Sequence, residues 1–318
     1  MQFAEILPDT YQRSPLHSDA RIWGETNCYV DLWIEVLHAF GFDPRAGLGF
    51  VLSADFEGEQ WQFIKYPIED LWSVYGVDVA ELNPWRGVEY HLLEHLGDGR
   101  LLTIEVDAFY LPDTAGVSYQ REHVKSSIVV NMIDDQTRRL GYFHGASYYE
   151  LHGEDFDGVL RRHHLGPDVL PPYVERVRIP AQPQTKSTAA LANIAMHLRR
   201  RPAENPVAKL ATRFDRDLAW LLEGGIEAFH LYAFATLRQC GATAELGASL
   251  CEWIVEHGYE TGGAEENFTR VASTAKTMQF KLARLAAGRS VDHTELFADM
   301  VAQWDIAMSR LDAVHGPL

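Results

Sequence analysis

The stretch GETNCYVDLWIEVLHAFGF, residues 24–42, predicts an amphipathic helix that begins beside a cysteine. From Leu32 onward, apolar side chains recur every four residues, which places them on one stripe of a helix. Gly41 is expected to end this helix. Thr26 or Asn27 can cap its N-terminus, because a short polar side chain accepts hydrogen bonds from the free amides of the first turn.

Cys28 would then occupy the first turn of this helix. There the helix dipole favours the anionic thiolate, which lowers the pKa of a thiol. Such a thiolate is a nucleophile for acyl transfer if a base and a group that orients the base lie nearby. The first-turn amides would form the oxyanion hole. The alternative is that Cys28 only packs, as we expect for Cys240 and Cys251 within their apolar helical patterns.

The chain has 318 residues, more than one typical domain, so two domains are expected. Hydrophobic residues make up 47% and charged residues 23%, a balance typical of a globular protein with a substantial core. The sequence changes character at RIPAQPQTKSTAA, residues 178–190, where Pro180 and Pro183 interrupt a polar segment. We therefore predict a first domain over residues 1–180 and a second over residues 185–318.

The first domain is expected to be α+β. Helices are predicted from Cys28 and from Pro84, followed by strands over residues 100–111, 126–134 and 138–151 that would form an antiparallel sheet. In the second domain strand patterns vanish, and the chain predicts an all-α bundle of five or six helices. The expected helices cover residues 186–200, 206–223, 226–240, 242–257, 264–287 and 292–314.

The best candidate for the base is His123, in YQREHVKSSIVV (119–130), because it lies just before a predicted strand. A rigid strand entry can hold an imidazole against a helix N-terminus; the alternative is a solvated loop histidine. The group that would orient His123 stays open between His144 and Asp107. Asp107 and Glu105 lie two residues apart on one strand, so both point to the same face. Such a pair fits either a site or a surface salt bridge.

Several motifs together resemble a bacterial family catalogued as domain of unknown function 1839, over most of the chain. They are the cysteine that opens a long helix, AGLGFVL (46–52), IEVDAFYLPDTAG (104–116), EHVKSSIVV (122–130) and YFHGASYYEL (142–151). More distantly, the first part, residues 20–150 in outline, resembles the N-terminal domain of the butirosin-biosynthesis acyltransferase, which has a papain-like fold.

This second resemblance implies a papain-like first domain in which Cys28 is the nucleophile and Asp107 and Tyr110 belong to the wall of the site. In the enzymes that it resembles, a histidine directly precedes the apolar strand and an acid follows later. Here two serines, Ser126 and Ser127, occupy the place of the histidine. His123 lies slightly earlier, and His144 lies where the acid would stand.

The resemblance further implies an acyltransferase that moves an aminoacyl group from the phosphopantetheine arm of a carrier protein to an amine. The expected catalytic residues are Cys28, His123, His144 and Asp107. The residues expected to bind the substrate are Asn27, Trp23, Tyr110 and Glu105. No cofactor of the chain's own is expected. Two alternatives remain open: a catalytically degenerate module that binds a carrier protein or small ligand, and a cysteine amide hydrolase.

The formal net charge of −17 argues against non-specific binding to nucleic acid or to an anionic membrane, since both are polyanions. RRHH (161–164) and RRR (199–201) are interpreted as solvated surface, with docking of an acidic carrier protein as the alternative. HLLEH (91–95) resembles an inverted zinc-protease motif, but we expect a solvent-facing helix there and no metal. Neither a secretory signal nor a membrane-spanning apolar stretch is evident, so a cytoplasmic protein with free thiols is expected.

Overall fold

The computed structural model describes residues 1–162, 171–286, 289 and 292–315. By their contacts the residues divide into two compact units, which we call the sheet unit and the helical unit. The sheet unit comprises residues 1–18, 27–44 and 68–185. The helical unit comprises residues 19–26, 45–67 and 186–318. Two residues of the RRHH motif, His163 and His164, lie outside the described residues.

The sheet unit contains six antiparallel strands in the order β3-β8-β4-β5-β6-β7, which confirms the predicted α+β class. The strands are β3 (Asp78–Glu81), β4 (Leu101–Asp107), β5 (Lys125–Asp134), β6 (Arg139–His144), β7 (Ser147–His152) and β8 (Val174–Arg178). The helices are α1 (Cys28–Ala39), α2 (Ile68–Asp70), α3 (Val88–Gly97) and α4 (Glu154–Val159). Two short 3₁₀ turns, η5 (Ala108–Tyr110) and η6 (Pro112–Thr114), follow β4.

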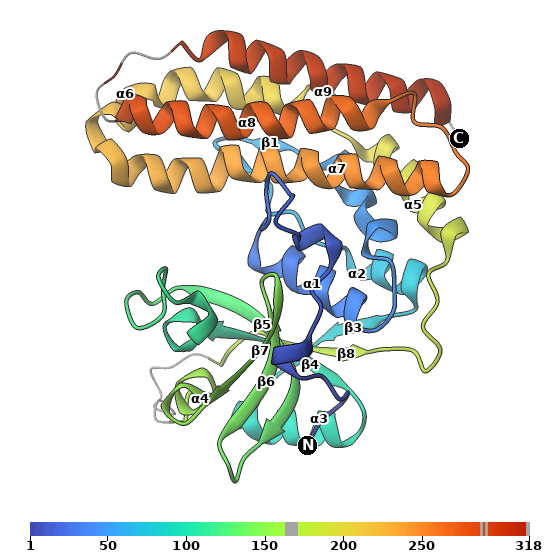
Figure 1. Ribbon diagram of the computed structural model, residues 1–318, viewed down its shortest axis with the longest axis vertical. Coiled ribbons are helices and arrows are strands. Elements are labelled where there is room, and N and C mark those ends of the chain that lie inside the picture. The colour runs from blue at the N-terminus through green and yellow to red at the C-terminus, as the bar shows by residue number, and fades with distance from the viewer. Residues whose placement is uncertain (163–170, 287–288, 290–291, 316–318) are drawn as a thin grey trace. The chain divides into compact units, whose positions relative to one another are not determined.

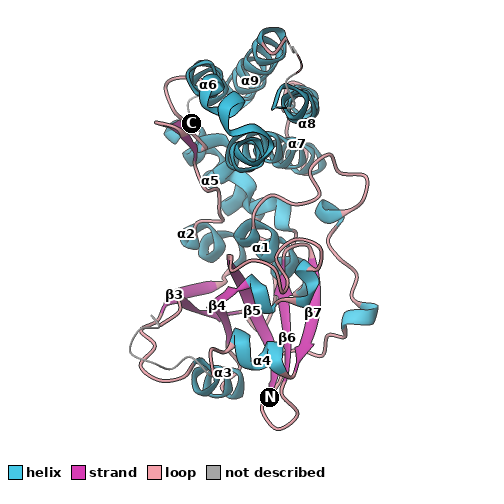
Figure 2. Cartoon of the chain, turned by 90° about the vertical axis from the view of Figure 1, so that its left-hand side faces the viewer, coloured by secondary structure: helices cyan, strands magenta, loops and turns pink. Residues whose placement is uncertain are grey.

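Strand β5 forms the centre of this unit. Ile128, Val129 and Val130 are fully buried although successive side chains of a strand point to opposite faces, so both faces of the sheet are covered. Helix α1 lies over one face and α3 over the other (Figures 1 and 2). The ring of Phe40, at the end of α1, packs on Phe143 of β6. This packing fixes the N-terminus of α1 relative to the start of β5.

The predicted third strand, residues 138–151, is a hairpin of β6 and β7. His144 and Ser147 are register partners, so only Gly145 and Ala146 form the turn. Gly145 has a φ of 49°, a left-handed conformation that glycine adopts at little cost and that tight hairpin turns require. The turn is too short to interrupt the run of aromatic residues on either side of it, which is why the sequence indicated one strand.

The helical unit confirms the helical second part of the prediction. Its helices are α5 (Ser187–Arg200), α6 (Pro206–Ala233), α7 (Gln239–Glu256), α8 (Ala264–Ala286) and α9 (Thr294–His315). Helices α6, α7, α8 and α9 run side by side (Figure 1). The unit also holds β1 (Phe56–Glu57), β2 (Gln60–Trp61), the 3₁₀ segment η3 (Pro44–Ser53) and the π-helical segment η7 (Phe234–Arg238).

The predicted break at Gly224-Gly225 is present as a kink. Although α6 is assigned over Pro206–Ala233, it consists of two helices that meet at Gly225, which has non-helical angles (φ 61°, ψ −144°). Glycine tolerates this conformation because it lacks a Cβ atom. The boundary predicted between the helices over residues 206–223 and 226–240 therefore coincides with this kink.

Two early segments of the chain belong to the helical unit, which differs from the single division expected near residue 180. The side chain of Trp23 is buried there: its indole N–H donates to the carbonyl of Ala272 (3.0 Å), and its backbone N–H donates to Glu245 (2.8 Å). The indole N–H of Trp61 donates to the hydroxyl of Thr243 (3.2 Å). Large aromatic side chains bury much apolar area, which accounts for the inclusion of both segments in this unit.

Replacement of Gly241 in α7 by alanine tests the burial of Trp23. The added Cβ would lie 2.5 Å from atoms of the indole ring, a distance that forces the ring or the helix to move. We expect a loss of about 1–2 kcal/mol in the free energy of unfolding, because overpacking outweighs the gain in helix propensity. Urea denaturation of the wild type and the variant measures this change in the free energy of unfolding. The control is Gly24→Ala, whose Cβ would meet no atom within 4 Å; equal effects of the two changes would contradict this packing.

A buried charged cluster lies beneath α1 in the sheet unit. His17 Nδ1 lies 2.5 Å from a carboxylate oxygen of Glu35, and its Nε2 lies 3.4 Å from Asp31. The hydroxyl of Tyr11 and the backbone N–H of Ser14 also donate to Glu35, at 2.6 and 3.0 Å. Burial alone would lower the pKa of His17, but its hydrogen bonds and charge interactions with Asp31 and Glu35 outweigh burial and raise the pKa to about 9.

The stability of the protein should therefore depend on pH through His17. The stabilisation is complete below the ordinary histidine pKa of 6.5 and is lost as the pH rises through about 9. A shift of this size corresponds to a loss on the order of 3 kcal/mol. The unfolding free energy of the wild type, measured from pH 6 to 10, should fall more steeply than that of His17→Gln, which cannot titrate. Parallel pH profiles would contradict a protonated His17.

Candidate active site

Cys28 is the first residue of α1, and Asn27 is the cap. The side-chain oxygen of Asn27 accepts hydrogen bonds from the amides of Tyr29 (3.1 Å) and Val30 (2.9 Å), while its backbone carbonyl accepts from Asp31 (3.1 Å). Asn27, predicted to bind the substrate, thus serves as a buried helix cap. Because the next three amides of the helix donate to Asn27, only the amide of Cys28 is available for the expected oxyanion hole. Among the described residues it has no hydrogen-bond acceptor.

The thiol of Cys28 is half-buried, and this burial is the main reason that its pKa is raised above the ordinary value. Hydrogen bonds from the hydroxyl of Ser126 and the backbone of Ser127 lower the pKa, as does the positive charge of Lys125. The negative charge of Asp31 raises it. The prediction of a lowered thiol pKa was wrong, because desolvation of the thiolate outweighs the hydrogen bonds and the positive charge that favour it.

A chain of hydrogen bonds continues from Ser126. Its hydroxyl lies 2.7 Å from Nε2 of His144, and Nδ1 of His144 lies 2.5 Å from a carboxylate oxygen of Asp113. The hydroxyl of Tyr142 donates to the other carboxylate oxygen of Asp113, also at 2.5 Å. Ser126 and His144 are both buried. A thiol, a hydroxyl, an imidazole and a carboxylate are thus connected in sequence.

The sheet positions these groups. Val129 of β5 and Phe143 of β6 are register partners. Ser126 and His144 each lie an odd number of residues from this pair, so alternation places their side chains on the same face of the sheet. Asp113 reaches the imidazole from η6, in the connection between β4 and β5.

Every hydrogen bond along this path can be donated in the same direction, from Cys28 toward Asp113. With His144 neutral, the Cys28 thiol donates to Ser126, Ser126 donates to Nε2, and the Nδ1–H donates to Asp113. Burial, and then the charge of Asp113, strongly raise the pKa of Tyr142, so its hydroxyl remains a donor. A proton can therefore pass from sulfur through the Ser126 hydroxyl to the imidazole.

His123 and Asp107 form a second imidazole–carboxylate pair, at 2.6 Å between Nδ1 and Oδ2. The imidazole stacks on Phe109, with ring centroids 4.5 Å apart and planes 13° apart. The amide of Phe109 donates to the other oxygen of Asp107 (3.0 Å). The side chain of His123 is 69% exposed. Among the described residues, the imidazole connected to the Cys28 thiol through Ser126 belongs to His144, and His123 makes no hydrogen bond to that thiol.

The remaining predicted residues have other surroundings. The carboxylate of Glu105 lies 3.4 Å from the ammonium group of Lys125. The ring of Tyr110 packs against Gly158 of α4 so closely that a Cβ atom there would overlap it. Trp23 belongs to the core of the helical unit, so its large indole is used for packing.

Ser126 and Asp113 were missed as site residues. Ser126 lies where the acyltransferase-like pattern expected from the sequence has a histidine, and this departure from the pattern was the one available signal. Asp113 follows Pro112 in a turn between the predicted strands over residues 100–111 and 126–134. Sequence spacing alone does not bring this turn beside β6.

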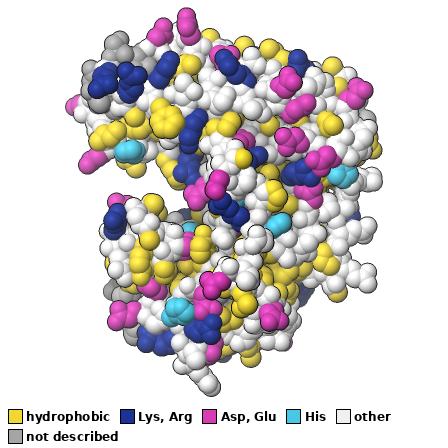
Figure 3. Space-filling view, in the orientation of Figure 1, with side chains coloured by type: hydrophobic (Ala, Val, Ile, Leu, Met, Phe, Trp, Pro, Cys, Tyr) yellow, Lys and Arg dark blue, Asp and Glu magenta, His cyan; other side chains and the backbone are white. Residues whose placement is uncertain are grey.

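His91 and His95 of the HLLEH motif lie on α3, where His95 accepts a hydrogen bond from Arg100 (3.0 Å). Over the described part of the chain, no group of three or more His, Cys, Asp or Glu side chains is arranged to hold a metal ion. The same part contains no helix long and apolar enough to cross a membrane. The face of the molecule in Figure 3 displays acidic and basic side chains interspersed with apolar ones.

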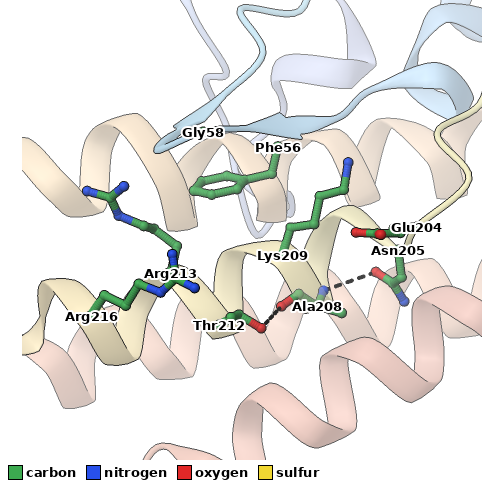
Figure 4. A pocket seen from close by; sticks show the side chains of 9 residues that line it. All are labelled: Phe56, Gly58, Glu204, Asn205, Ala208, Lys209, Thr212, Arg213 and Arg216. Carbon is green, nitrogen blue, oxygen red and sulfur yellow. Dashed lines mark hydrogen bonds between the residues drawn. The ribbon is translucent and has the colours of Figure 1, made fainter.

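A pocket of about 510 Å³ lies in the helical unit, where Lys209, Arg213 and Arg216 project from α6 (Figure 4). Two of these cations are paired: Lys209 with Asp55 at 3.0 Å, and Arg213 with Asp217 at 2.8 Å. Because its charges are largely neutralised and it lacks a nucleophile, this pocket is a weaker candidate for catalysis than the surroundings of Cys28.

Two family models match consecutive parts of the chain. The DUF1839 N-terminal domain matches residues 12–179, and the DUF1839 C-terminal domain matches residues 183–313. The chain belongs to the DUF1839 family. No curated protein matches the sequence. The match to the DUF1839 N-terminal domain includes all four residues of the hydrogen-bonded path: Cys28, Ser126, His144 and Asp113.

The reactivity of Cys28 should report its surroundings. In a pH series with iodoacetamide, followed for each cysteine by mass spectrometry, we expect the midpoint for Cys28 above that of an ordinary thiol. Ser126→Ala should raise this midpoint further, by about one pH unit, because a hydrogen bond to the thiolate is lost. Cys240 and Cys251 are internal controls, since burial raises their pKa strongly. An unchanged or lower midpoint in Ser126→Ala would show that Ser126 does not contact the thiol.

Proposed function

We propose that the protein is a cysteine acyltransferase that moves an aminoacyl group from a carrier-protein thioester to an amine through a thioester on Cys28. The observation that carries the proposal is the hydrogen-bonded chain from Cys28 through Ser126 to His144 and Asp113. Acyl transfer through a side chain needs a nucleophile, a base and a group that orients the base. The geometry supplies a residue for each of these roles.

The raised thiol pKa defines how this site would work. Cys28 is protonated at neutral pH, so the proton must leave as the sulfur attacks the carbonyl carbon. Ser126 passes that proton to Nε2 of His144, and the carboxylate of Asp113 stabilises the resulting imidazolium. Tyr142 holds the carboxylate in place. The donor thiolate then leaves and takes the proton from His144, so the acyl-enzyme retains a neutral imidazole.

The fold supports the papain-like interpretation. A nucleophile that begins a helix packed against an antiparallel sheet, with an imidazole on that sheet, is the arrangement that the resemblance implied. The amide of Cys28 supplies one donor for the carbonyl oxygen of the tetrahedral intermediate.

The proposed donor is an aminoacyl group on a phosphopantetheine arm. A half-buried thiol is reached more readily by a long, slender arm than by a folded protein surface. All three cysteines are free, which fits a reducing cytoplasm as the proposed location.

A second candidate is a binding module that recognises a carrier protein or small ligand without chemistry. The raised pKa of Cys28 favours it, because many catalytic cysteines have lowered thiol pKa values. An amide hydrolase would use the same chain of groups and differ only in having water as the acceptor.

An aminoacyl-pantetheine thioester tests the proposal. Intact-protein mass spectrometry should show one aminoacyl group on the wild type and none on Cys28→Ala. His144→Ala and Ser126→Ala should slow labelling by about 10²-fold or more, because the proton has no path to a base. Thermal unfolding of each variant establishes that it is folded.

The other outcomes identify the alternatives. Labelling that survives in Cys28→Ala and is lost in Ser126→Ala would make Ser126 the nucleophile. An unlabelled wild type that retains the probe non-covalently would favour the binding module.

A further inference from the structure

The imidazoles of His144 and His123 differ in which ring nitrogen atoms are available. His144 is buried, and both of its ring nitrogens are engaged, one by Asp113 and the other by Ser126. The Nε2 atom of His123 has no partner among the described residues, while its Nδ1 is held by Asp107. A group from solvent can therefore form a hydrogen bond with Nε2 of His123. It cannot do so with His144, because both ring nitrogens of His144 are already bonded.

The His123–Asp107 pair lies at the same end of the sheet as the thiol. Asp107 is the register partner of Lys125, whose charge acts on Cys28. Ser127, two residues further along β5, contacts the same thiol through its backbone. His123 precedes Lys125 by two residues. The pair therefore flanks the strand entry that faces the sulfur.

The imidazole of His123 is also held in one orientation although it is exposed. Stacking on Phe109 and the 2.6 Å contact with Asp107 fix the plane of the ring. The amide of Phe109 fixes Asp107 in turn. An exposed side chain held by two contacts has lost rotational freedom, which is expected of a group that must meet a second molecule in a defined direction.

We propose that His123 is the general base for the acceptor amine, and that Asp107 positions it, while His144 serves the Cys28 thiol alone. This inference rests on the proposed acyl transfer. It assigns the two half-reactions to two separate imidazole–carboxylate pairs, one buried and one exposed.

In the second half-reaction the acceptor nitrogen attacks the carbonyl carbon of the Cys28 thioester. The carbon–nitrogen bond forms, the carbon–sulfur bond breaks, and Nε2 of His123 takes the proton that the nitrogen loses. The Cys28 thiolate departs and takes up one proton from solvent, which its raised pKa favours. His123 releases its proton to solvent, so the amide product and the free thiol account for all atoms.

Separate measurement of the two half-reactions tests this assignment. Wild type and His123→Ala are labelled with the aminoacyl-pantetheine thioester, and decay of the acyl-enzyme is then followed with ethanolamine as the acceptor. We expect His123→Ala to label at the wild-type rate and to transfer the group about 10²-fold more slowly. Added imidazole should restore transfer in this variant, because the vacated position is exposed to solvent. Asp107→Asn should also label at the wild-type rate and transfer the group more slowly, with a smaller decrease in the transfer rate than in His123→Ala.

The matched control is His152→Ala. His152 is another exposed histidine next to a carboxylate, Glu150 at 3.5 Å, on the same sheet. It should leave both half-reactions unchanged. Chemical rescue by imidazole separates a base from a residue that only maintains the fold.

Each remaining outcome contradicts the assignment. Wild-type transfer by His123→Ala would remove His123 from the reaction. Loss of labelling in His123→Ala would make it the base for the thiol. An unlabelled wild type would overturn the acyl transfer itself, and this role with it.

Discussion

The packing of α1 against β5 is the contact on which the proposed chemistry depends. Asn27 ends the preceding segment and caps the helix, so the next residue, Cys28, is placed over the strand entry. Trp33 and Leu37 of α1 are fully buried, and each such side chain contributes about 1.5–3 kcal/mol when removed from water. This apolar contact holds the sulfur beside Ser126. It also desolvates the sulfur, so the fold that builds the site makes the thiolate harder to form.

That cost explains why a buried proton path accompanies the thiol. A solvent-exposed thiol can lose its proton to water, whereas a desolvated thiol needs a base connected to it. Ser126 provides the connection because it is small and its hydroxyl both donates and accepts. His144 and Asp113 complete the path within the same buried region. The exposed imidazole of His123 lies in a different environment and suits a different proton.

The sequence predicted the parts of this unit that carry strong local periodicity. The helix that begins at Cys28 and the strand over residues 126–134 were predicted because their apolar residues follow a regular pattern. The short strands β3 and β8 were missed, since four or five residues carry little pattern. Cys28, His123, Asp107 and His144 were selected from residue type and position. The roles of Ser126 and Asp113, and the raised thiol pKa, depend on long-range packing and burial, which local sequence does not encode.

The discontinuous make-up of the helical unit affects how the two halves of this chain can be inherited. Residues 19–26 and 45–67 supply Trp23 and Trp61 to that unit, although they precede most of the sheet in sequence. A recombination event near residue 180 would transfer α5 to α9 without these two indoles, and the remaining half would keep two apolar segments with nothing to cover them. The DUF1839 N-terminal and C-terminal domains are therefore expected to be inherited together, within one gene.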